Sequence, residues 1–576
     1  MSQTEQRQGK LFEQRRRTMP RVVLRSLFVL PCSFFLTAAA MQPDRASILI
    51  HNAIVYTMDA GQPRAEAMAI RGSRILAVGT NADVLKLRGP YTRVIDAKGG
   101  TVVPGLHDAH GHFTGLGALL RRLDLRGTAS YAEVLDKVRA RVATAKPGEW
   151  ILGRNWDQND WPTKEFPTAE ELDKVAPNNP VYLNRVDGHA ALVNAAAMKA
   201  AGLSAATKDP AGGRIIRNRA GQPTGVLVDR AMGLVSSKIP PDSDAEVMDH
   251  IRLADREARR LGLTMVHDAG ASPRIVDLYR KVAAEGALQT RLYVMLRGSL
   301  SELAPVFAKG PVVGEYEGRL TVRAMKISAD GALGSRGAAL LEDYSDEPGN
   351  RGLVLMEPER IYELTLAAAK AGFQTCIHAI GDRANRLVLD LFERMQKEVP
   401  SARELRLRIE HAQILDASDI PRFAKLGVIA SMQGTHCTSD MPWASARLGP
   451  ERVAEGAYVW QKLIKSGATI ANGSDFPVEE ANPLLGFYAS ITRQDPAGQP
   501  PNGWAPEQRM TREQALASFT INAAYAAHAE KELGSLTTGK LADLVVLSKD
   551  IMTIPPREIL ETRVVLTIVG GQVVHE

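Results

Sequence analysis

The 576-residue sequence predicts an α/β protein built as a (β/α)8 TIM barrel with a composite β-sandwich and an inserted domain. Three observations indicate this fold class. Short apolar stretches alternate with helix-like segments through the middle of the chain, as in βα repeats. β-rich blocks occur at both ends of the chain, and each is too small to bury its own apolar face. A gap far too long for one crossover follows the first predicted barrel strand.

Residues 1–40 have the pattern of a signal peptide. An arginine-rich start precedes the apolar stretch 27–36, and Ala38-Ala39-Ala40 offers a cleavage site of small residues. This stretch is too short for an ordinary transmembrane helix. We therefore expect an exported protein, periplasmic or secreted, without a stable membrane anchor. The alternatives are a disordered tail or a start of translation at Met19.

The net charge of +6 does not indicate a nucleic-acid partner. Residues 1–40 hold seven basic and two acidic side chains, so their +5 leaves only +1 for the rest of the chain. Outside that segment the cysteines are Cys376 and Cys437, which are too few for a disulfide framework. We expect a small-molecule substrate as the partner, with a homodimer left open.

Alternation of apolar and polar residues locates the two sandwich blocks. The stretches 47–58, 67–78 and 91–96 predict strands of the first block, and 541–547 and 564–574 predict strands of the second. The expected segments are a signal peptide at 1–40, the N-terminal block of the β-sandwich at 46–104, the barrel strand 1 region at 105–127, an inserted α/β domain at 128–254, the barrel remainder at 255–533 and the C-terminal block of the β-sandwich at 534–576.

Eight short apolar stretches are expected to form the barrel. The clearest helix between them follows Gly381, with its apolar residues on one face, and another at 359–371 is stopped by Gly372. In the insertion, a helix at 130–144 begins with a capping-box pattern at Ser130 and Glu133. The expected barrel strands are 102–106, 264–267, 292–296, 322–327, 374–378, 407–411, 428–432 and 469–471.

The stretch Val102–His112 ends in a His-x-His pair that points to a metal site. Residues two apart in an extended chain face the same side, so His110 and His112 converge. Asp108 shares their parity and is expected to support them, whereas His107 faces the other way and is interpreted as structural. Converging imidazoles suit Zn²⁺ or a similar ion, but a single such pair is weak evidence.

Other predicted barrel strands end in further donor residues. Lys326 lies in the fourth strand, His378 and His411 end the fifth and sixth, and Asp475 follows the eighth. The C-terminal strand ends of such a barrel share one rim, so the sequence predicts a metal site there. An ammonium cannot ligate, but a lysine near cations should lose its proton readily. The alternative is a lysine paired with Asp330 or Asp475.

With these motifs in place, the chain resembles the amidohydrolase superfamily, in particular its YtcJ-like branch (amidohydrolase family 3), which is related to N-substituted formamide deformylases. The matching stretches run from about residue 46 to the C-terminus and include PGLHDAHGHF, VDGHAALVN, MKISADGALGSRGAAL, HAIGDRAN, RIEHAQ, ASMQGTH, NGSDFPV and GSLTTGKLADLVVL. The resemblance implies two divalent metals, such as zinc, and hydrolysis of a non-peptide C–N bond. It assigns the metal site to His110, His112, Lys326, His378, His411 and Asp475.

The resemblance implies a role for Lys326, and amide chemistry suggests one for Asp475. Lys326 would react with CO2 to give a carbamate that bridges two metals, and metal-bound hydroxide would attack a small N-substituted amide. Asp475 would pass the proton of the attacking water to the leaving nitrogen, with a helix N-cap before Pro477 as its alternative role. Gly434 stands where the branch often has proline, which affects the expected shape of the substrate pocket.

Four further residues are candidates for substrate binding: His189, His267, Arg336 and His436. Each histidine could instead be a packing residue, and Arg336 could lie in a solvated turn. Other functions stay open on the same scaffold, namely a hydrolase of esters or cyclic imides, an isomerase, or an inactive regulatory or binding relative. The fold alone does not decide among them, because specificity lies in loops.

Overall fold

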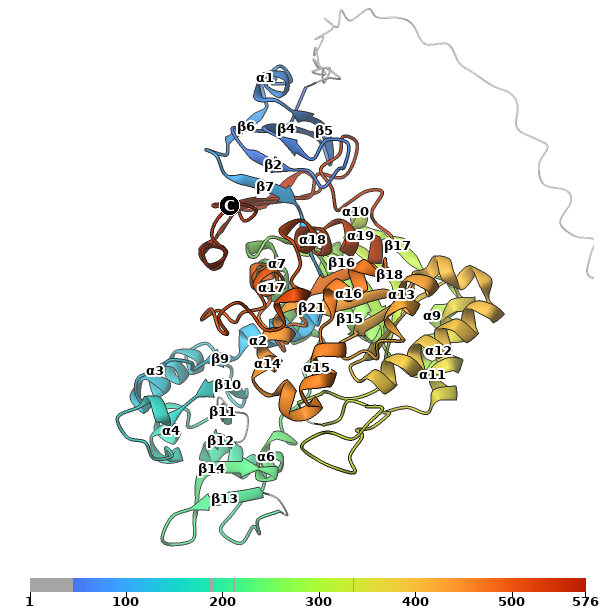
Figure 1. The fold of residues 1–576 in the computed structure, drawn as a ribbon. Helices are drawn as coiled ribbons and strands as arrows, with labels where there is room; N and C mark the ends of the chain where they lie inside the picture. The colour runs from blue at the N-terminus through green and yellow to red at the C-terminus, as the bar shows by residue number, and fades with distance from the viewer. Residues whose placement is uncertain (1–44, 186–189, 211–212, 335) are drawn as a thin grey trace, which may run out of the picture. The chain divides into compact units, whose positions relative to one another are not determined.

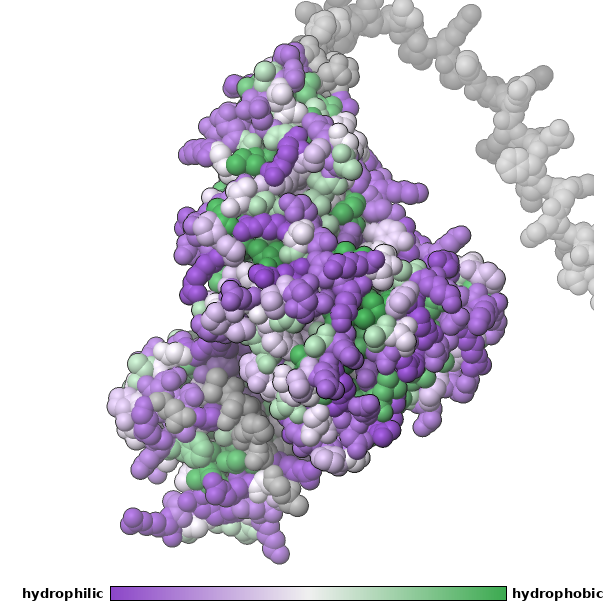
Figure 2. Space-filling view, viewed as in Figure 1, coloured by the Kyte–Doolittle hydropathy of each residue, from purple (hydrophilic) through white to green (hydrophobic). Residues whose placement is uncertain are grey.

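The computed structural model describes residues 45–185, 190–210, 213–334 and 336–576. The predicted signal peptide therefore lies outside the described residues. The unit that runs from Arg45 to Glu576 contains four sheets in its described part (Figure 1). No helix among the described residues is long and apolar enough to cross a membrane. The face drawn in Figure 2 is mostly hydrophilic.

The central sheet contains eight parallel strands in chain order, which confirms the predicted barrel. A short antiparallel strand, β17 (Val312–Gly314), is added to it. The eight strands are β8 (Leu106–Gly111), β15 (Leu263–Ala271), β16 (Arg291–Leu296), β18 (Leu320–Ser328), β19 (Gln374–Ala379), β20 (Arg408–His411), β21 (Ile429–Gln433) and β22 (Ile470–Gly473).

Helices follow most of these strands. The two clearest predicted helices are confirmed as α11 (Pro358–Lys370) and α12 (Asp382–Glu398). The other helices of this part of the chain are α2 (Phe113–Arg121), α7 (Asp244–Arg260), α8 (Pro273–Ala284), α9 (Leu300–Phe307), α10 (Glu315–Gly318), α13 (Ile420–Leu426), α14 (Gly434–Leu448), α15 (Pro450–Gly456), α16 (Trp460–Lys465), α17 (Pro483–Thr492), α18 (Arg512–Ser518) and α19 (Ile521–Ala526).

The first barrel strand is not the predicted stretch 102–106. Residues Thr101–Pro104 form β7, which belongs to the sandwich, and the barrel strand β8 begins after Gly105. Pro104 has no N–H to continue a ladder. A Cβ at Gly105 would lie 2.2 Å from Thr264 Oγ1, so only glycine fits where the chain leaves one sheet for the other. The Pro-Gly pair thus separates two strands that the apolar pattern had merged.

Strands β8 and β22 close the barrel without a regular ladder. The backbone N–H of Asp475 donates to the carbonyl of His110 over 2.6 Å, and the N–H of His112 donates to that of Phe476 over 2.7 Å. We call this contact between residues 108–112 and 473–476 the closure seam. Three of the predicted metal ligands, His110, His112 and Asp475, therefore belong to the closure seam.

The carboxylate of Asp108 ties the closure seam together. It accepts hydrogen bonds from the backbone N–H of His110 (3.0 Å), from that of Ser474 (3.1 Å) and from Ser474 Oγ (2.6 Å). Gly473 lies against the same bonds, because a Cβ there would be 2.5 Å from His110 N and 2.6 Å from Asp108 Oδ1. Asp108 thus supports His110 through the backbone, in line with the supporting role expected for it.

Strands from both ends of the chain, blue and red in Figure 1, form one composite sandwich. Buried side chains such as Ile50, Val55, Met68, Leu544 and Ile568 fill the core between its two sheets. One sheet contains β5 (Arg74–Gly79), β4 (Ala67–Arg71), β1 (Ile48–His51) and β6 (Arg93–Asp96), with α1 (Asn81–Leu85) beside it; the other contains β25 (Gln572–His575), β24 (Val564–Val569), β23 (Leu544–Leu547), β7, β2 (Ile54–Tyr56) and β3 (Arg64–Ala65).

A separate six-stranded sheet forms the insertion, with Trp156 and Trp161 buried in its core. This sheet begins with β9, before the expected boundary at residue 128. Helix α7, which the expected boundary at residue 254 divides, packs against α2, with Gly117 of α2 touching the backbone of His250. The elements are β9 (Leu123–Asp124), β10 (Ile151–Trp156), β11 (Val181–Arg185), β12 (Ala190–Val193), β13 (Gly213–Arg217), β14 (Pro223–Asp229), α3 (Tyr131–Val142), α4 (Ala169–Val175), α5 (Ala195–Ala200) and α6 (Gly233–Ser236).

Candidate metal centre

Five strand ends and the start of α2 carry the six residues predicted as metal ligands. Because the barrel strands are parallel, their C-terminal ends lie on one rim. His110 lies in β8, His112 caps α2, Lys326 lies in β18, His378 in β19, His411 ends β20 and Asp475 follows β22.

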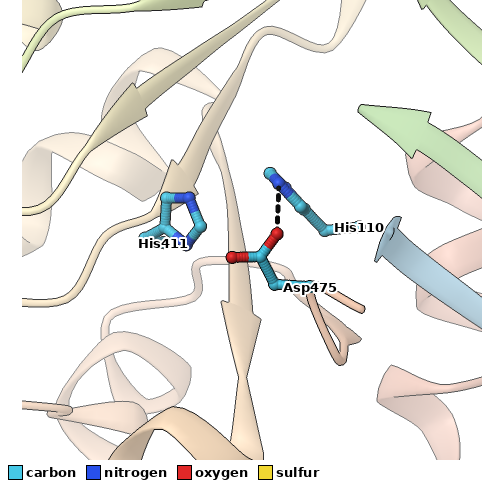
Figure 3. A group of neighbouring side chains, drawn as sticks. All are labelled: His110, His411 and Asp475. Carbon is cyan, nitrogen blue, oxygen red and sulfur yellow. Dashed lines mark ion pairs between the residues drawn. The ribbon is translucent and has the colours of Figure 1, made fainter. Parts of the chain in front are cut away.

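His110, His411 and Asp475 form the centre of this group (Figure 3). One ligand atom of each lies within 4.8 Å of the others, and all three side chains are buried. Asp475 Oδ1 is 3.5 Å from His110 Nε2 and 3.1 Å from His112 Nε2. Imidazole nitrogens and a carboxylate oxygen are donors that zinc and similar divalent ions accept.

Two of these residues have left-handed backbone conformations. The φ angle is 76° at His411 and 60° at Asp475, which is uncommon for residues other than glycine. Backbone strain of this kind persists only where the surrounding structure over-determines it, and it gathers at functional sites. Both residues lie where a strand ends, and both belong to the group at the candidate centre.

The electrostatics of the centre favour the ligating forms of the side chains. Burial lowers the pKa of His110 to about 4 and that of His378 to about 3, so both imidazoles are neutral at pH 7. Burial alone would raise the pKa of Asp475. The hydrogen bond from His112 and the neighbouring histidines instead hold it well below its usual range, so Asp475 is ionised. Neutral imidazoles and a carboxylate can bind a cation without first losing protons.

Lys326 lies directly beside the centre. Its Nζ is 3.2 Å from His110 Nε2, and its side chain is buried. Burial lowers the pKa of the Lys326 ammonium, although the charges of Glu410 and Asp475 oppose this shift. The amine is thereby brought closer to the neutral form that can react as a nucleophile.

His378 and His436 border the centre through His411. The His378 ring centroid is 4.5 Å from that of His411, and its Nε2 is 3.4 Å from Asp330 Oδ1. The ring of His436, from the first turn of α14, stacks on His411 at 5.7 Å. His436 Nε2 is 3.6 Å from Asp475 Oδ2, so the structure places this substrate-binding candidate at the centre.

Unpartnered buried atoms gather at this place. His378 Nε2 and His436 Nε2 are buried and have no hydrogen-bond partner among the described residues. A buried polar atom without a partner is costly and usually marks a missing ligand or water. The donor atoms and their charge states fit a divalent ion of the zinc type.

The structure does not bring Arg336 or His267, two other substrate-binding candidates, to the centre. Arg336 pairs with Asp346 at 2.9 Å and Glu347 at 3.3 Å, so its charge is already compensated within its own loop. His267 is fully buried inside the barrel, where its Nδ1 bonds Arg408 Nη1 over 2.9 Å. The prediction that strand two ends at His267 is wrong, because β15 continues to Ala271. His189 lies outside the described residues.

Two residues without a role in the sequence-based prediction lie beside the centre inside the barrel: Glu410, which contacts His110, and Arg408, which contacts Glu410. Glu410 Oε2 lies 2.5 Å from His110 Nδ1, and Arg408 Nε lies 2.8 Å from Glu410 Oε1. Both side chains are fully buried. The signal in the sequence is RIEH, where two opposite charges alternate within a strand that is otherwise buried.

Comparison with known proteins defines the class. The model of the amidohydrolase family matches residues 93–575, which is most of the chain. The protein therefore belongs to the amidohydrolase family and is an enzyme of the class that hydrolyses carbon–nitrogen bonds.

Individual relatives match along nearly the whole chain. The chain is similar to protein LONG AFTER FAR-RED 3 of Arabidopsis thaliana (37% identical, 92% of this chain and 91% of the relative). It is also similar to the putative amidohydrolase YtcJ of Bacillus subtilis (32%, 91% and 99%) and to N-substituted formamide deformylase of Arthrobacter pascens (30%, 92% and 98%). An uncharacterized metal-dependent hydrolase from Pyrococcus furiosus shares the fold, with a TM-score of 0.72 and 27% identity over 88% of this chain and 100% of that chain.

Proposed function

We propose that the protein hydrolyses the C–N bond of a small N-substituted amide with the help of divalent metal. The observation that carries this proposal is the buried group of His110, His411 and Asp475, with its donor atoms within 4.8 Å of one another on the barrel rim. The similarity to an N-substituted formamide deformylase supports the choice of amide over ester substrates.

The residues that would hold the metal are the six on the rim. His110, His112, His378, His411 and Asp475 offer imidazole nitrogens and a carboxylate, and Lys326 lies within reach of the same centre. When bound, one or two zinc-like ions would make a water acidic and polarise the amide carbonyl. We infer two sites, because these donors exceed the four that a single tetrahedral ion takes.

Asp475 is positioned to move the proton of the reaction. It is ionised, and its Oδ1 lies 3.1 Å from His112 Nε2 and 3.5 Å from His110 Nε2. It would take a proton from the attacking water and deliver it to the leaving nitrogen, which an amine needs in order to depart. His436 Nε2, near the other oxygen of Asp475, would donate a hydrogen bond to the substrate carbonyl.

Lys326 would act as a carbamate rather than as an ammonium. Its lowered pKa favours the neutral amine, which adds to CO2 and loses a proton to give an anionic carbamate. The two carbamate oxygens would then serve as ligands on a side chain that otherwise has none. Its distance of 3.2 Å from His110 Nε2 supports this placement.

The proposal is tested by metal analysis together with a substrate screen. Purified protein should contain at least one divalent ion per chain and should release amines from N-substituted formamides and acetamides. Esters of matched size and cyclic imides form the comparison set. Fewer than about one ion per chain, together with no hydrolysis across the amide panel, would contradict the proposal and favour an inactive binding relative. Faster hydrolysis of the esters or imides would reassign the substrate.

We also propose that the protein is exported and acts on a freely diffusing small molecule. The arginine-rich start and apolar stretch of residues 1–40 support export. A fusion of this segment to a reporter enzyme that is active only outside the cytoplasm tests it, and a silent reporter would contradict export. A homodimer is testable by sedimentation of the purified chain.

A further inference from the structure

A fully buried ion pair lies inside the barrel against the proposed metal centre. Arg408 and Glu410 are two residues apart in β20, and both side chains have 0% exposure. The atoms Arg408 Nε and Glu410 Oε1 are 2.8 Å apart, and Arg408 Nη2 donates to Glu410 Oε2 over 3.1 Å. The guanidinium of Arg408 therefore contacts both carboxylate oxygens of Glu410.

Arg408 is also bonded to three other strands of the barrel. Its Nη2 donates to the carbonyl of Ala109 in β8 over 2.6 Å and to Ser431 Oγ in β21 over 2.8 Å. Its Nη1 contacts His267 Nδ1 in β15 at 2.9 Å. These contacts fix the guanidinium, and through it the carboxylate of Glu410, relative to β8.

The second oxygen of Glu410 reaches His110, which the structure places at the metal centre. Glu410 Oε2 and His110 Nδ1 are 2.5 Å apart, while His110 Nε2 points to the opposite side, toward Lys326 Nζ and Asp475 Oδ1. A carboxylate beside Nδ1 keeps the proton on that nitrogen. The lone pair is then on Nε2, the atom that faces the centre.

A buried ion pair is a poor source of stability. Taking both charges out of water costs several kcal/mol per ion, and apolar residues of similar size often serve stability as well or better. The position of this pair suggests a different use. Histidines that bind metal commonly donate their second ring N–H to a carboxylate, which fixes both the ring and its tautomer.

We infer that Glu410 is a positioning residue that holds His110 in the Nδ1–H tautomer, with Nε2 free for the metal, and that Arg408 holds Glu410 in place. This inference rests on the proposed function only in that it names His110 as a metal ligand. The tautomer itself is a property of the protein without metal, so the two claims can be tested separately.

The test replaces the pair by apolar residues. A variant with Glu410→Leu alone would leave the charge of Arg408 buried without a partner and could fail to fold. The double variant Arg408→Met/Glu410→Leu removes both charges and keeps the volume. Zinc affinity of the full-length chain is measured by competition with a chelator, and we expect about 10- to 100-fold weaker binding in the double variant.

A second measurement reads the tautomer directly. Histidine-selective ¹⁵N labelling of the metal-depleted full-length chain distinguishes Nδ1–H from Nε2–H at His110, with circular dichroism as the check of folding. We expect Nδ1–H in the parent protein and a shift toward Nε2–H in the double variant. An unchanged tautomer in the folded variant, or unchanged zinc affinity where the parent binds zinc, would overturn the inference.

The chain offers a matched control. Arg291 and Asp543 form another buried pair, with 2.7 Å between Nε and Oδ2 and 3% exposure of each side chain. Their other hydrogen bonds go to backbone groups of Glu317, Gly318 and Gly570. Arg291→Met/Asp543→Leu should change stability but neither the His110 tautomer nor zinc affinity. A parent protein that shows the Nδ1–H tautomer but binds no zinc would contradict the proposed function and leave the positioning role of Glu410 supported.

Discussion

Asp475 combines three properties that seldom occur in one carboxylate. It is buried, it is ionised, and its two oxygens face imidazole nitrogens of His110, His112 and His436. A carboxylate used only as a helix cap would have its oxygens bonded to backbone N–H groups. The left-handed backbone at Asp475 adds a conformational cost that a structural cap would not require. These properties favour proton transfer and metal binding as its role.

Replacing Asp475 by asparagine tests that role. Asparagine keeps the shape but cannot take up a proton, so we expect kcat to fall by about 10²–10⁴, the range typical of lost general acid–base catalysis. Steady-state kinetics on the best amide substrate measures the change, and the melting temperature serves as the control of folding. A variant with an unchanged rate would remove Asp475 from the mechanism.

Lys326→Ala tests the proposed carbamate. Alanine removes the only nitrogen that could carry it in β18, so we expect both metal content per chain and activity to fall. Elemental analysis of the purified variant gives the metal content. Cys376→Ser, a neighbouring change inside the barrel, is the control and should leave metal content unchanged. If Lys326→Ala retains full metal content and activity, the bridging role is wrong.

The buried histidines predict acid sensitivity of the metal-free protein. The folded-state pKa is about 4 for His110 and about 3 for His378, against about 6.5 in an unfolded chain. Below pH 6.5 the unfolded chain therefore binds protons that the folded protein does not. The free energy of unfolding should fall as pH falls from about 6.5 to about 4, by roughly 1.4 kcal/mol per pH unit for each histidine.

Urea unfolding of the chelator-treated protein at several pH values measures this slope. The variant His378→Gln lacks one of the two groups, so its slope should be shallower than that of the parent. Equal slopes for variant and parent would show that His378 is not buried in its neutral form.

At the scale of elements, the closure seam sets the geometry of the candidate metal centre. Gly473 permits β22 to approach β8, since a Cβ would come within 2.5 Å of His110 N. Gly473→Ala should separate the strands and move Asp475 away from His110. We expect a loss of about 1–3 kcal/mol in unfolding free energy, as for other overpacked sites, together with weaker zinc binding.

Gly233→Ala is the matched control for the closure seam. No atom lies within 4 Å of a Cβ built at Gly233, and its φ angle is not in the left-handed region. Both variants are compared by denaturant unfolding and chelator competition. A Gly473→Ala protein with the stability and zinc affinity of the control would show that the closure seam tolerates expansion.

The sequence predicted the site residues at the strand ends better than the residues inside the barrel. His110, His411 and Asp475 come together because strand ends of a parallel barrel share a rim, which needs no side-chain detail. His267 was placed too near the rim, because its apolar pattern does not reveal that β15 runs on to Ala271. The role of Glu410 could not be predicted, since it depends on which ring nitrogen of His110 it meets.

At the scale of the whole molecule, the composite sheet joins the two ends of the chain. Strand β23 pairs with β7 on one side and with β24 on the other. Removing residues 564–576 would expose the edge of β23. It would also delete Leu566 and Ile568, whose side chains fill the sandwich core with 3% and 0% exposure. Each such side chain contributes about 1.5–3 kcal/mol, so we expect a low soluble yield and rapid proteolysis.

Deleting Glu576 alone is the control for this truncation. Glu576 pairs with Arg93 at the surface with 63% of its side chain exposed, and surface pairs contribute little. Soluble yield and limited proteolysis should match the parent protein. If the longer truncation behaves like this control, the C-terminal strands are dispensable for folding.

The overall architecture was accessible from the sequence because it depends on patterns of many residues. Eight strands, the composite sandwich and the insertion each rest on repeated alternation or on long gaps. The boundaries were less accessible. The pattern of residues 102–106 predicts one strand, yet Pro104 and Gly105 divide these residues between two sheets. The close contact between Gly105 and Thr264 explains this division, and the two residues are 159 positions apart in the chain.

The closure seam also has a consequence for synthesis of the protein. Asp108 and Ser474, which it joins, are 366 residues apart in the chain. A nascent chain emerges from its N-terminus, so His110 and His112 are exposed long before Asp475 is made. Until then the two proposed ligands would hold a metal only as loosely as any exposed pair of histidines. At the proposed metal centre, high-affinity metal uptake would therefore require a chain that extends at least to Asp475, and bound metal would stabilise only molecules whose barrel has closed.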